Sequence, residues 1–227
     1  MKNVTVSLSF MLLGVVFCAC LIASNLLETK IIQLGPVTIT AGFLVFPISY
    51  IINDCIAEVW GFGKARLIIW LGFAVNFAMV ALFQIAVALP AAPFWEGDAA
   101  FRFIFGLAPR IAASSLLAFL LGSFLNAYVM SRMKIASRGK HFSARAILST
   151  LAGESADSFI FFPLAFGGLV PVQELLKMMA IQIFAKTAYE IVVLPLTIRV
   201  VSLLKHVEGM DAYDTDISYN ILKIKEI

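Results

Sequence analysis

The sequence predicts an all-α membrane protein: a bundle of six transmembrane helices, some of them kinked or broken, with both termini in the cytoplasm. Of its 227 residues, 61% are hydrophobic and only 14% are charged, against about 45–50% and about 25% in soluble domains. The mean hydropathy is +0.96, and several long segments carry no charge. The net charge of +3 is too small to indicate a nucleic-acid partner. We therefore expect the chain to lie in a lipid bilayer.

Six segments are long enough to span the hydrocarbon core, which needs about 20 apolar residues. They lie at about residues 5–27, 33–53, 67–90, 110–131, 146–166 and 176–203. The first is longer than the roughly 7–15 apolar residues of a signal peptide, so we expect it to remain in the protein. The expected organisation is one transmembrane domain over residues 1–207 and a loosely ordered cytoplasmic tail over residues 208–227.

Lysine and arginine residues determine the expected orientation. With the loop from Ser131 to Arg145 in the cytoplasm, 12 of the 17 Lys and Arg residues lie on that side, 4 lie on the other and Lys186 stays in the membrane. Such an excess marks the cytoplasmic side, so both termini are expected inside. Lys64 and Arg66 are expected to follow a turn in a cytoplasmic loop.

Proline and uncharged polar residues within the spans predict how the helices bend and pack. Each of Pro47, Pro163 and Pro195 removes a backbone donor, which favours a kink or a break. Three single amides are expected to form hydrogen bonds between helices. They are Asn76, Gln84 and Asn126.

Glu154 and Asp157 are the first candidate functional residues. An ionisable side chain in the hydrocarbon costs at least about 2.5–3.5 kcal/mol, so its presence suggests a function. Their spacing of three places them on one helical face, with Phe161 four residues further on. Two carboxylates near a ring would suit a planar ligand with N–H donors. A proton relay and a structural ion pair are the alternatives.

Gln182, Lys186 and Glu190 form the second candidate group. Their spacing of four produces one polar stripe on an otherwise apolar helix. Lys186 could pair with Glu190 on the same helix, or it could neutralise Glu154 or Asp157 across the bundle. Tyr189 could stack on a ligand or donate its hydroxyl.

Asp54 and Glu58 form the third candidate group, again four residues apart. They are either solvated carboxylates at the cytoplasmic end of the second span or part of a site inside the bundle. Asn25, at the other end of the first span, could line the mouth of a cavity.

Catalysis, a cofactor and a bound metal are not expected. His141 and His206 are the only histidines, and neither lies in a span, so zinc sites and Ser-His chemistry have no basis within the membrane. The segment GESAD lacks the glycine spacing of a nucleophile elbow. We therefore predict that the protein is not an enzyme.

Four segments contain the intramembrane charges and their neighbours. They are ASNLLETKII at 23–32, FPISYIINDCIAEVWGFGKAR at 46–66, GESADSFIFFPLAF at 153–166 and KTAYEIVVLPLT at 186–197. In these segments and their order the chain resembles the queuosine precursor transporter family, six-span bacterial inner-membrane proteins also classed as vitamin-uptake-type transporters. The resemblance runs from about residue 5 to about residue 205.

The resemblance implies a multi-pass importer, with residues 1–207 as the transporter domain, in the bacterial inner membrane. Its substrates would be the 7-deazaguanines preQ0 and preQ1, or queuine, which are salvaged for tRNA modification without contact with nucleic acid. The expected substrate-binding residues are Glu154, Asp157, Lys186, Glu190, Gln182, Tyr189, Asn25, Asp54 and Phe161. Two alternatives are a substrate-binding subunit of an energy-coupling-factor-type transporter and a proton-coupled transporter of another purine-like molecule. A homodimer is left open.

Overall fold

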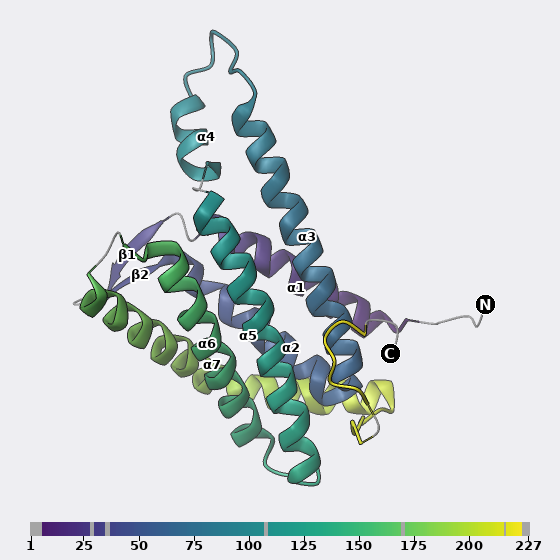
Figure 1. Cartoon of the computed structure of the whole chain (residues 1–227). Helices are drawn as coiled ribbons and strands as arrows, with labels where there is room; N and C mark the ends of the chain where they lie inside the picture. Colours follow the sequence, from purple (N-terminus) through teal and green to yellow (C-terminus); the bar gives the residue numbers. More distant parts are fainter. Residues whose placement is uncertain are drawn as a thin grey trace.

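A computed structural model describes residues 6–27, 30–34, 37–106, 109–168, 171–215 and 217–223, and most of these residues are helical. The helices are α1 (Leu8–Leu27), α2 (Phe46–Trp60), α3 (Phe62–Ala88), α4 (Asp98–Phe105), α5 (Pro109–Ala136), α6 (Phe142–Phe166) and α7 (Val172–Glu208) (Figure 1). A 3-10 turn at Ala41–Leu44 precedes α2, and the strands are β1 (Ile31–Leu34) and β2 (Val37–Thr40).

Within the described residues, five helical segments are long and apolar enough to cross a membrane. They are Leu8–Leu27, Ala41–Trp60, Phe62–Ala88, Ala113–Ala136 and Val172–Glu208. Helix α6 has 25 residues but is not one of them, because Glu154 and Asp157 lower the hydropathy of its middle. The predicted class, a helical protein with several membrane spans, is confirmed. The count of six spans and the orientation of the termini stay predictions.

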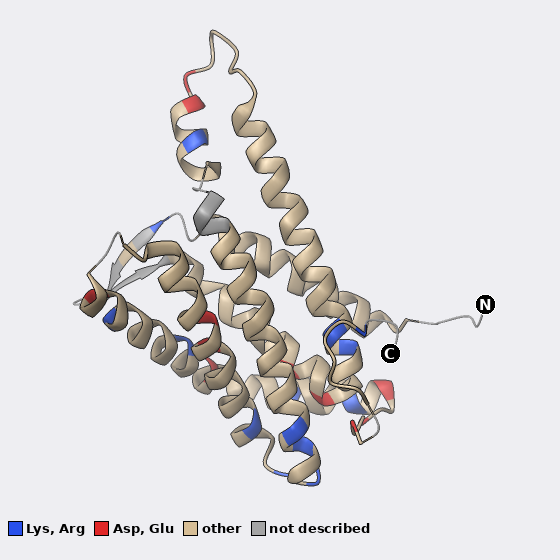
Figure 2. Ribbon diagram, in the orientation of Figure 1, with Lys and Arg blue, Asp and Glu red and all other residues tan. Residues whose placement is uncertain are grey.

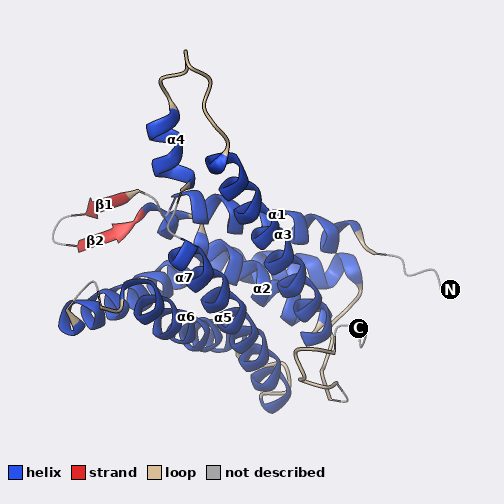
Figure 3. Cartoon of the chain, turned by 45° about the horizontal axis from the view of Figure 1, so that its top comes forward, coloured by secondary structure: helices blue, strands red, loops and turns tan. Residues whose placement is uncertain are grey.

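Helix α2 is the central element of the bundle. It packs against α1, α3, α5 and α7, and all but two of its 15 residues are buried. Helix α6 lies between α5 and α7, and the helices together form the body of the molecule with the small sheet at one edge (Figure 3). Any polar residue on α2 is therefore placed where the other helices converge.

The expectation that the second span begins near residue 33 is wrong. Strands β1 and β2 form an antiparallel hairpin in which Ile31 is opposite Thr40. Two features explain this: the β-branched, alternating run from Val37 to Thr40 favours a strand, and a Gly-Pro pair before it is typical of a turn. The spanning segment starts only at Ala41.

The loop expected between the second and third spans is reduced to one residue, Gly61. Helix α2 ends at Trp60 and α3 begins at Phe62. Gly61 has φ 84° and ψ 175°, a conformation that residues with a side chain rarely adopt. Arg66, expected in a cytoplasmic loop, is instead buried in α3. Pro47 lies in the first turn of α2, where proline is favoured, so the expected kink there is wrong.

The start of α1 and the end of α7 meet at the same end of the bundle, which we call the tail end. The rings of Phe10 and Trp60 are 5.4 Å apart, and a cavity of about 390 Å³ lies beside them. It is lined by Val6, Ser7, Phe10, Trp60, Lys64, Glu208 and Met210. The hairpin, which joins the other end of α1 to the start of α2, defines the opposite hairpin end.

The tight crossing of α5 and α6 leads to a prediction about Gly153. A Cβ atom at Gly153 would lie 2.9 Å from the backbone oxygen of Gly122 and 2.6 Å from the Tyr50 ring. Overpacking of this kind typically costs about 1–3 kcal/mol. We expect Gly153→Ala to lower the midpoint of thermal unfolding in detergent.

The matched control for this prediction is Gly14→Ala. A Cβ atom at Gly14 would meet only the flexible tip of Ile68, at 2.9 Å, so a smaller loss is expected. Equal midpoints for Gly153→Ala and the unmodified protein would show that the α5–α6 crossing can relax.

Candidate functional site

Three ionisable side chains, which we call the triad, lie together within the bundle: Glu154 and Asp157 on α6 and Lys186 on α7. The Lys186 ammonium is 2.8 Å from a Glu154 carboxylate oxygen and 3.6 Å from one of Asp157. All three residues are at most 7% exposed. Of the two pairings considered for Lys186, the structure therefore shows the one across the bundle.

Two aromatic residues of α2 adjoin the triad. The Lys186 ammonium lies 3.8 Å from the centre of the Phe46 ring, where a cation is attracted by the π-electrons. The rings of Phe46 and Tyr50 are 5.7 Å apart. The buried Tyr50 hydroxyl and the Glu154 oxygen Oε1 have no hydrogen-bond partner in the described part of the chain.

A second buried group, the acid pair, consists of Asp54 on α2 and Glu190 on α7. The two carboxyl groups lie close enough to interact electrostatically and are 0% and 1% exposed. The Ser149 hydroxyl donates to Asp54 at 3.3 Å. Of the two alternatives considered for Asp54, a solvated carboxylate at a helix end and a residue inside the bundle, the structure therefore shows the second.

A third group, the five-residue network, closes the tail end of the bundle around Glu58, which is completely buried. Arg145 of α6 binds both Glu58 carboxylate oxygens, and Lys205 of α7 binds one of them at 2.6 Å. Lys134 of α5 is 3.7 Å from Glu58, and Asp211 contacts Lys134 and Lys205 at 2.5 Å and 2.9 Å. The network therefore joins α2, α5, α6 and α7.

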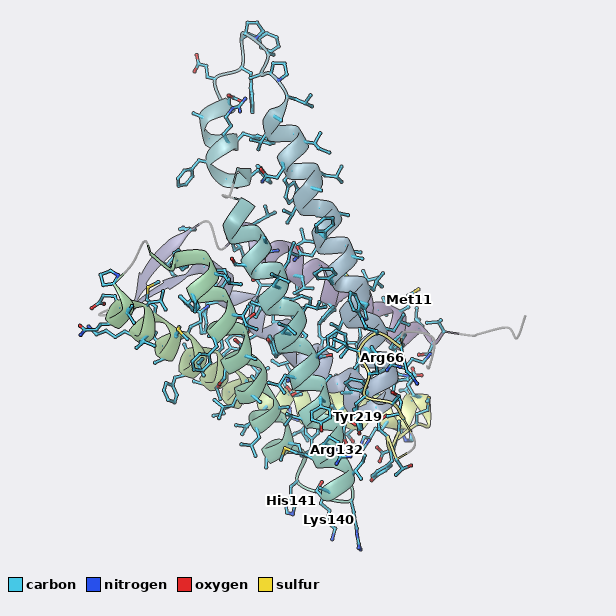
Figure 4. The ribbon with its side chains drawn as sticks, in the orientation of Figure 1. Met11, Arg66, Arg132, Lys140, His141 and Tyr219 are labelled. Carbon is cyan, nitrogen blue, oxygen red and sulfur yellow. The ribbon has the colours of Figure 1, made fainter. Side chains whose placement is uncertain are left out.

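The tail after α7, which we expected to be loosely ordered, packs against the helices. We call its described residues, 209–215 and 217–223, the strap. Arg66 donates to the backbone oxygens of Ser218 and Asn220 at 2.9 Å and 2.8 Å. The Asp214 carboxylate accepts from the Phe62 amide and the Ser131 hydroxyl. Figure 4 shows Arg66 and Arg132 on either side of the label of Tyr219, which is a residue of the strap. The Arg132 guanidinium is 5.6 Å from the Tyr219 ring centre.

Lowering the pH should loosen the strap. Burial raises the pKa of Asp211, but the hydrogen bonds from Lys134 and Lys205 outweigh it and hold this pKa below its ordinary value. A carboxyl group whose pKa is lowered by folding stabilises the folded state at pH values above its pKa in the unfolded chain. This contribution is lost as the pH falls through the lowered pKa of the folded state. The amide of the next residue, Ala212, donates to the Val59 backbone oxygen at 3.1 Å. We expect hydrogen exchange at this amide, corrected for its intrinsic pH dependence, to show less protection in acid.

The variant Asp211→Asn should show this weaker protection already at neutral pH. Asp98→Asn, which alters an exposed ion pair with Arg102, is the control and should leave the Ala212 amide unchanged. Unchanged protection in Asp211→Asn would mean that the strap is held by its other contacts alone.

Four of the expected site residues lie outside the triad and the acid pair. Asn25 donates to Asn76 at 2.7 Å and accepts from Ser115 at 3.2 Å, so it joins helices. Phe161 packs on Phe162 and Phe166. Gln182 is half-buried one turn before Lys186. Tyr189, also half-buried, has its ring 5.8 Å from that of Phe43.

The three amides expected to join helices do so. Beside the Asn76 bond to Asn25, Asn126 accepts from Asn53 at 2.6 Å. Gln84 donates to the Phe105 oxygen at 3.1 Å, which ties α3 to α4.

Sequence reasoning did not identify Phe46, Ser149, Arg145 and Lys134 as parts of these groups. The signal for Ser149 was present, because it shares the helical face of Gly153 and Asp157 on α6. Arg145 and Lys134 were counted only as cytoplasmic loop charges, yet both are 1% exposed. Nothing in the sequence near Phe46 indicates its contact with Lys186.

Chemically, the triad combines negative oxygens, an ammonium group and aromatic rings in a setting shielded from water. Such a group can bind a polar, planar molecule through hydrogen bonds and stacking. Within the described residues, no group of three or more His, Cys, Asp or Glu side chains is arranged to hold a metal ion. Buried charges within membrane helices are typical of transport pathways.

The fold and these buried charges define a multi-pass membrane transporter. A family model described as "Putative vitamin uptake transporter" matches residues 40–200, which is more than half of the chain. The chain belongs to this vitamin uptake transporter family. As the family consists of transporters, the protein is a transporter and not an enzyme.

Three curated relatives resemble the chain. The "Probable queuosine precursor transporter" of Bacillus subtilis (strain 168) is 29% identical over 175 residues, which cover 77% of this chain and 76% of the relative. The "Queuosine precursor transporter" of Escherichia coli (strain K12) is 29% identical over 127 residues, 56% of this chain and 55% of the relative. The "Probable queuosine precursor transporter" of Haemophilus influenzae is 30% identical over 128 residues, 56% of this chain and 52% of the relative. No solved structure gives a significant match.

Proposed function

We propose that this transporter imports 7-deazaguanine precursors of queuosine, such as preQ0 and preQ1, for salvage into tRNA. The names of the three relatives support this substrate class. The observation that carries the proposal is the triad: buried carboxylates and a buried ammonium beside the Phe46 ring, with one Glu154 oxygen and the Tyr50 hydroxyl unpaired.

A 7-deazaguanine matches the chemistry of the triad. It presents N1–H and an exocyclic amine on one edge, and a carboxylate offers two acceptor oxygens to such a pair of donors. We assign this role to Glu154 or Asp157. The ring carbonyl accepts from Lys186, and the flat bicyclic ring stacks on Phe46 or Tyr50. The cationic arm of preQ1 would favour a further carboxylate. Glu190, one helical turn from Lys186, could supply it.

We also propose six spans, with α6 as the fifth in chain order, and both termini in the cytoplasm. Helix α6 lies between α5 and α7, so its charged face is covered by protein. The start of α1 and the strap lie at the same end of the bundle, as six spans require. Figure 2 shows Lys and Arg residues gathered at the tail end of α5 and α6 and around the strap, which supports a cytoplasmic tail end.

Rescue of queuosine in tRNA tests the substrate. The chain is expressed in a bacterium that can neither make nor import the precursors, and preQ0, preQ1 or guanine is supplied at low concentration. Import is supported if a supplied deazaguanine leads to modified tRNA in cells that express the chain and not in cells that lack it. An excess of guanine should not compete with the deazaguanine. No rescue by any precursor, with the protein present in the membrane, would contradict the proposed substrate class.

Uptake by the purified chain in liposomes tests whether it transports alone. Accumulation of labelled preQ0 or preQ1 without a partner supports a complete importer. Binding without uptake would instead favour a substrate-binding subunit that needs an energy-coupling partner.

A further inference from the structure

The acid pair occupies the layer between the triad and the five-residue network. On α2, Asp54 is one helical turn from Glu58, and on α7, Glu190 is one turn from Lys186. Three layers of buried charge therefore follow each other: α7 connects the triad with the acid pair, and α2 connects the acid pair with the network. The outer layers both contain cations: Lys186 in the triad, and Arg145, Lys134 and Lys205 in the network.

The middle layer differs because neither Asp54 nor Glu190 forms an ion pair with any described residue. The groups facing it from α6 are the Ser149 hydroxyl, which donates to Asp54, and Thr150 beside Glu190. Glu154, also on α6, lies near enough to interact with Glu190. The Asn126 amide faces Asp54 from α5, and Tyr50 precedes Asp54 by one turn on α2.

Two adjacent carboxylates without a cation cannot both stay ionised in such a place. An unpaired buried charge is strongly disfavoured, and a second negative charge beside it adds repulsion. Both Glu190 oxygens lack a hydrogen-bond partner in the described part of the chain. A proton held between the two carboxyl groups removes one charge and supplies the missing hydrogen bond.

We propose that Asp54 and Glu190 form a proton-binding site and that passage of this proton drives transport. The proton enters from water on the side of higher proton concentration, is held by the pair, and leaves to water on the other side. No covalent bond to the substrate forms or breaks. The proposal rests on the membership in a transporter family and not on the identity of the substrate.

The position of the pair explains how the proton and the substrate are coupled. Glu190 and Lys186 are one turn apart on α7, and Glu154 interacts with both. A substrate that donates hydrogen bonds to Glu154 therefore changes the electrostatic field at Glu190. A shift of α7 that exposes the triad also separates Glu190 from Asp54 and releases the proton.

Infrared difference spectroscopy on the purified protein in lipid nanodiscs tests the site without any substrate. The unmodified protein should show a protonated-carboxyl C=O band at neutral pH that disappears on titration to alkaline pH. This band should be lost in Glu190→Gln and shifted or lost in Asp54→Asn. Glu174→Gln, an exposed position at the start of α7, is the matched control and should retain it. A spectrum without this band in the unmodified protein would overturn the proposal.

Proteoliposomes test the coupling. With labelled preQ1 or preQ0, an acid-outside pH jump should drive accumulation by the unmodified protein and by Glu174→Gln. Glu190→Gln and Asp54→Asn should each lose this accumulation. Accumulation that persists in both Glu190→Gln and Asp54→Asn would overturn the coupling. If the unmodified protein transports neither precursor, the proposed substrate is wrong, while the infrared result still decides the proton site.

Discussion

Replacing Lys186 with methionine should abolish transport and cost about 3–5 kcal/mol of stability, the usual result of removing one partner of a buried ion pair. Methionine has similar length and no charge, so Glu154 and Asp157 would remain buried without their cation. The large loss is expected because all three side chains are at least nine-tenths buried. Thermal unfolding in detergent and substrate uptake in liposomes provide the two measurements.

A second variant separates the structural role of Lys186 from its role in binding. Lys186→Met combined with Glu154→Gln removes one of the two uncompensated charges, so part of the lost stability should return while transport stays absent. Lys177→Met is the control, because its ion pair with Glu174 is mostly exposed and should contribute no more than about 1 kcal/mol. Transport by Lys186→Met at the normal rate would contradict the assignment of the triad to substrate binding.

Replacing Glu58 with glutamine should destabilise the tail end by a similar amount, about 3–5 kcal/mol. The amide cannot neutralise the three cations around it, and Arg145 and Lys134 are themselves only 1% exposed. The expected results are a lower unfolding midpoint and faster hydrogen exchange in the strap, because Lys134 and Lys205 also hold Asp211.

The comparison variant for Glu58→Gln is Asp98→Asn. Asp98 also pairs with a cation, Arg102, at 2.6 Å, but the two side chains are 35% and 44% exposed, so a loss of about 0.2–1 kcal/mol is expected. Equal losses for the two variants would mean that the burial of Glu58 adds nothing to the strength of its ion pairs.

The chain's intramembrane charges could be found from the sequence because a charge within an apolar run is conspicuous. Glu154, Asp157, Lys186 and Glu190 were identified in this way, and spacing alone placed each pair on one helical face. Spacing does not reveal which faces meet across the bundle. The pairing of Lys186 with Glu154 was therefore one of two alternatives until the packing of α6 against α7 was known.

Charge counting was least informative about Arg66 and Arg145. Both were counted as residues on the cytoplasmic side, but the partners that bury them are distant in the sequence. Arg145 binds Glu58, 87 residues away, and Arg66 binds the backbone of the strap, 152 residues away. A count of charges indicates only on which side of the membrane a residue is expected. It contains no information about which residues are in contact, so it could not predict either interaction.

Local backbone chemistry explains the errors in element boundaries. The apolar content of residues 31–40 suited a membrane span, but β-branched residues after a Gly-Pro pair favour a hairpin. Likewise, the run from Gly61 to Gly63 was expected to form a loop. Only Gly61 interrupts the helix, because a single residue with positive φ is enough to separate α2 from α3.

By itself, the sequence determined that this protein is helical, lies in a membrane and places ionisable residues inside it, since these properties follow from composition and periodicity along the chain. The tertiary structure alone decided which charges neutralise each other. It placed Lys186 in the triad, gathered three cations around Glu58 and left Asp54 beside Glu190. The physical reason is that the energy of a buried charge depends on the few groups within hydrogen-bonding distance, and helix packing brings those groups from distant parts of the chain.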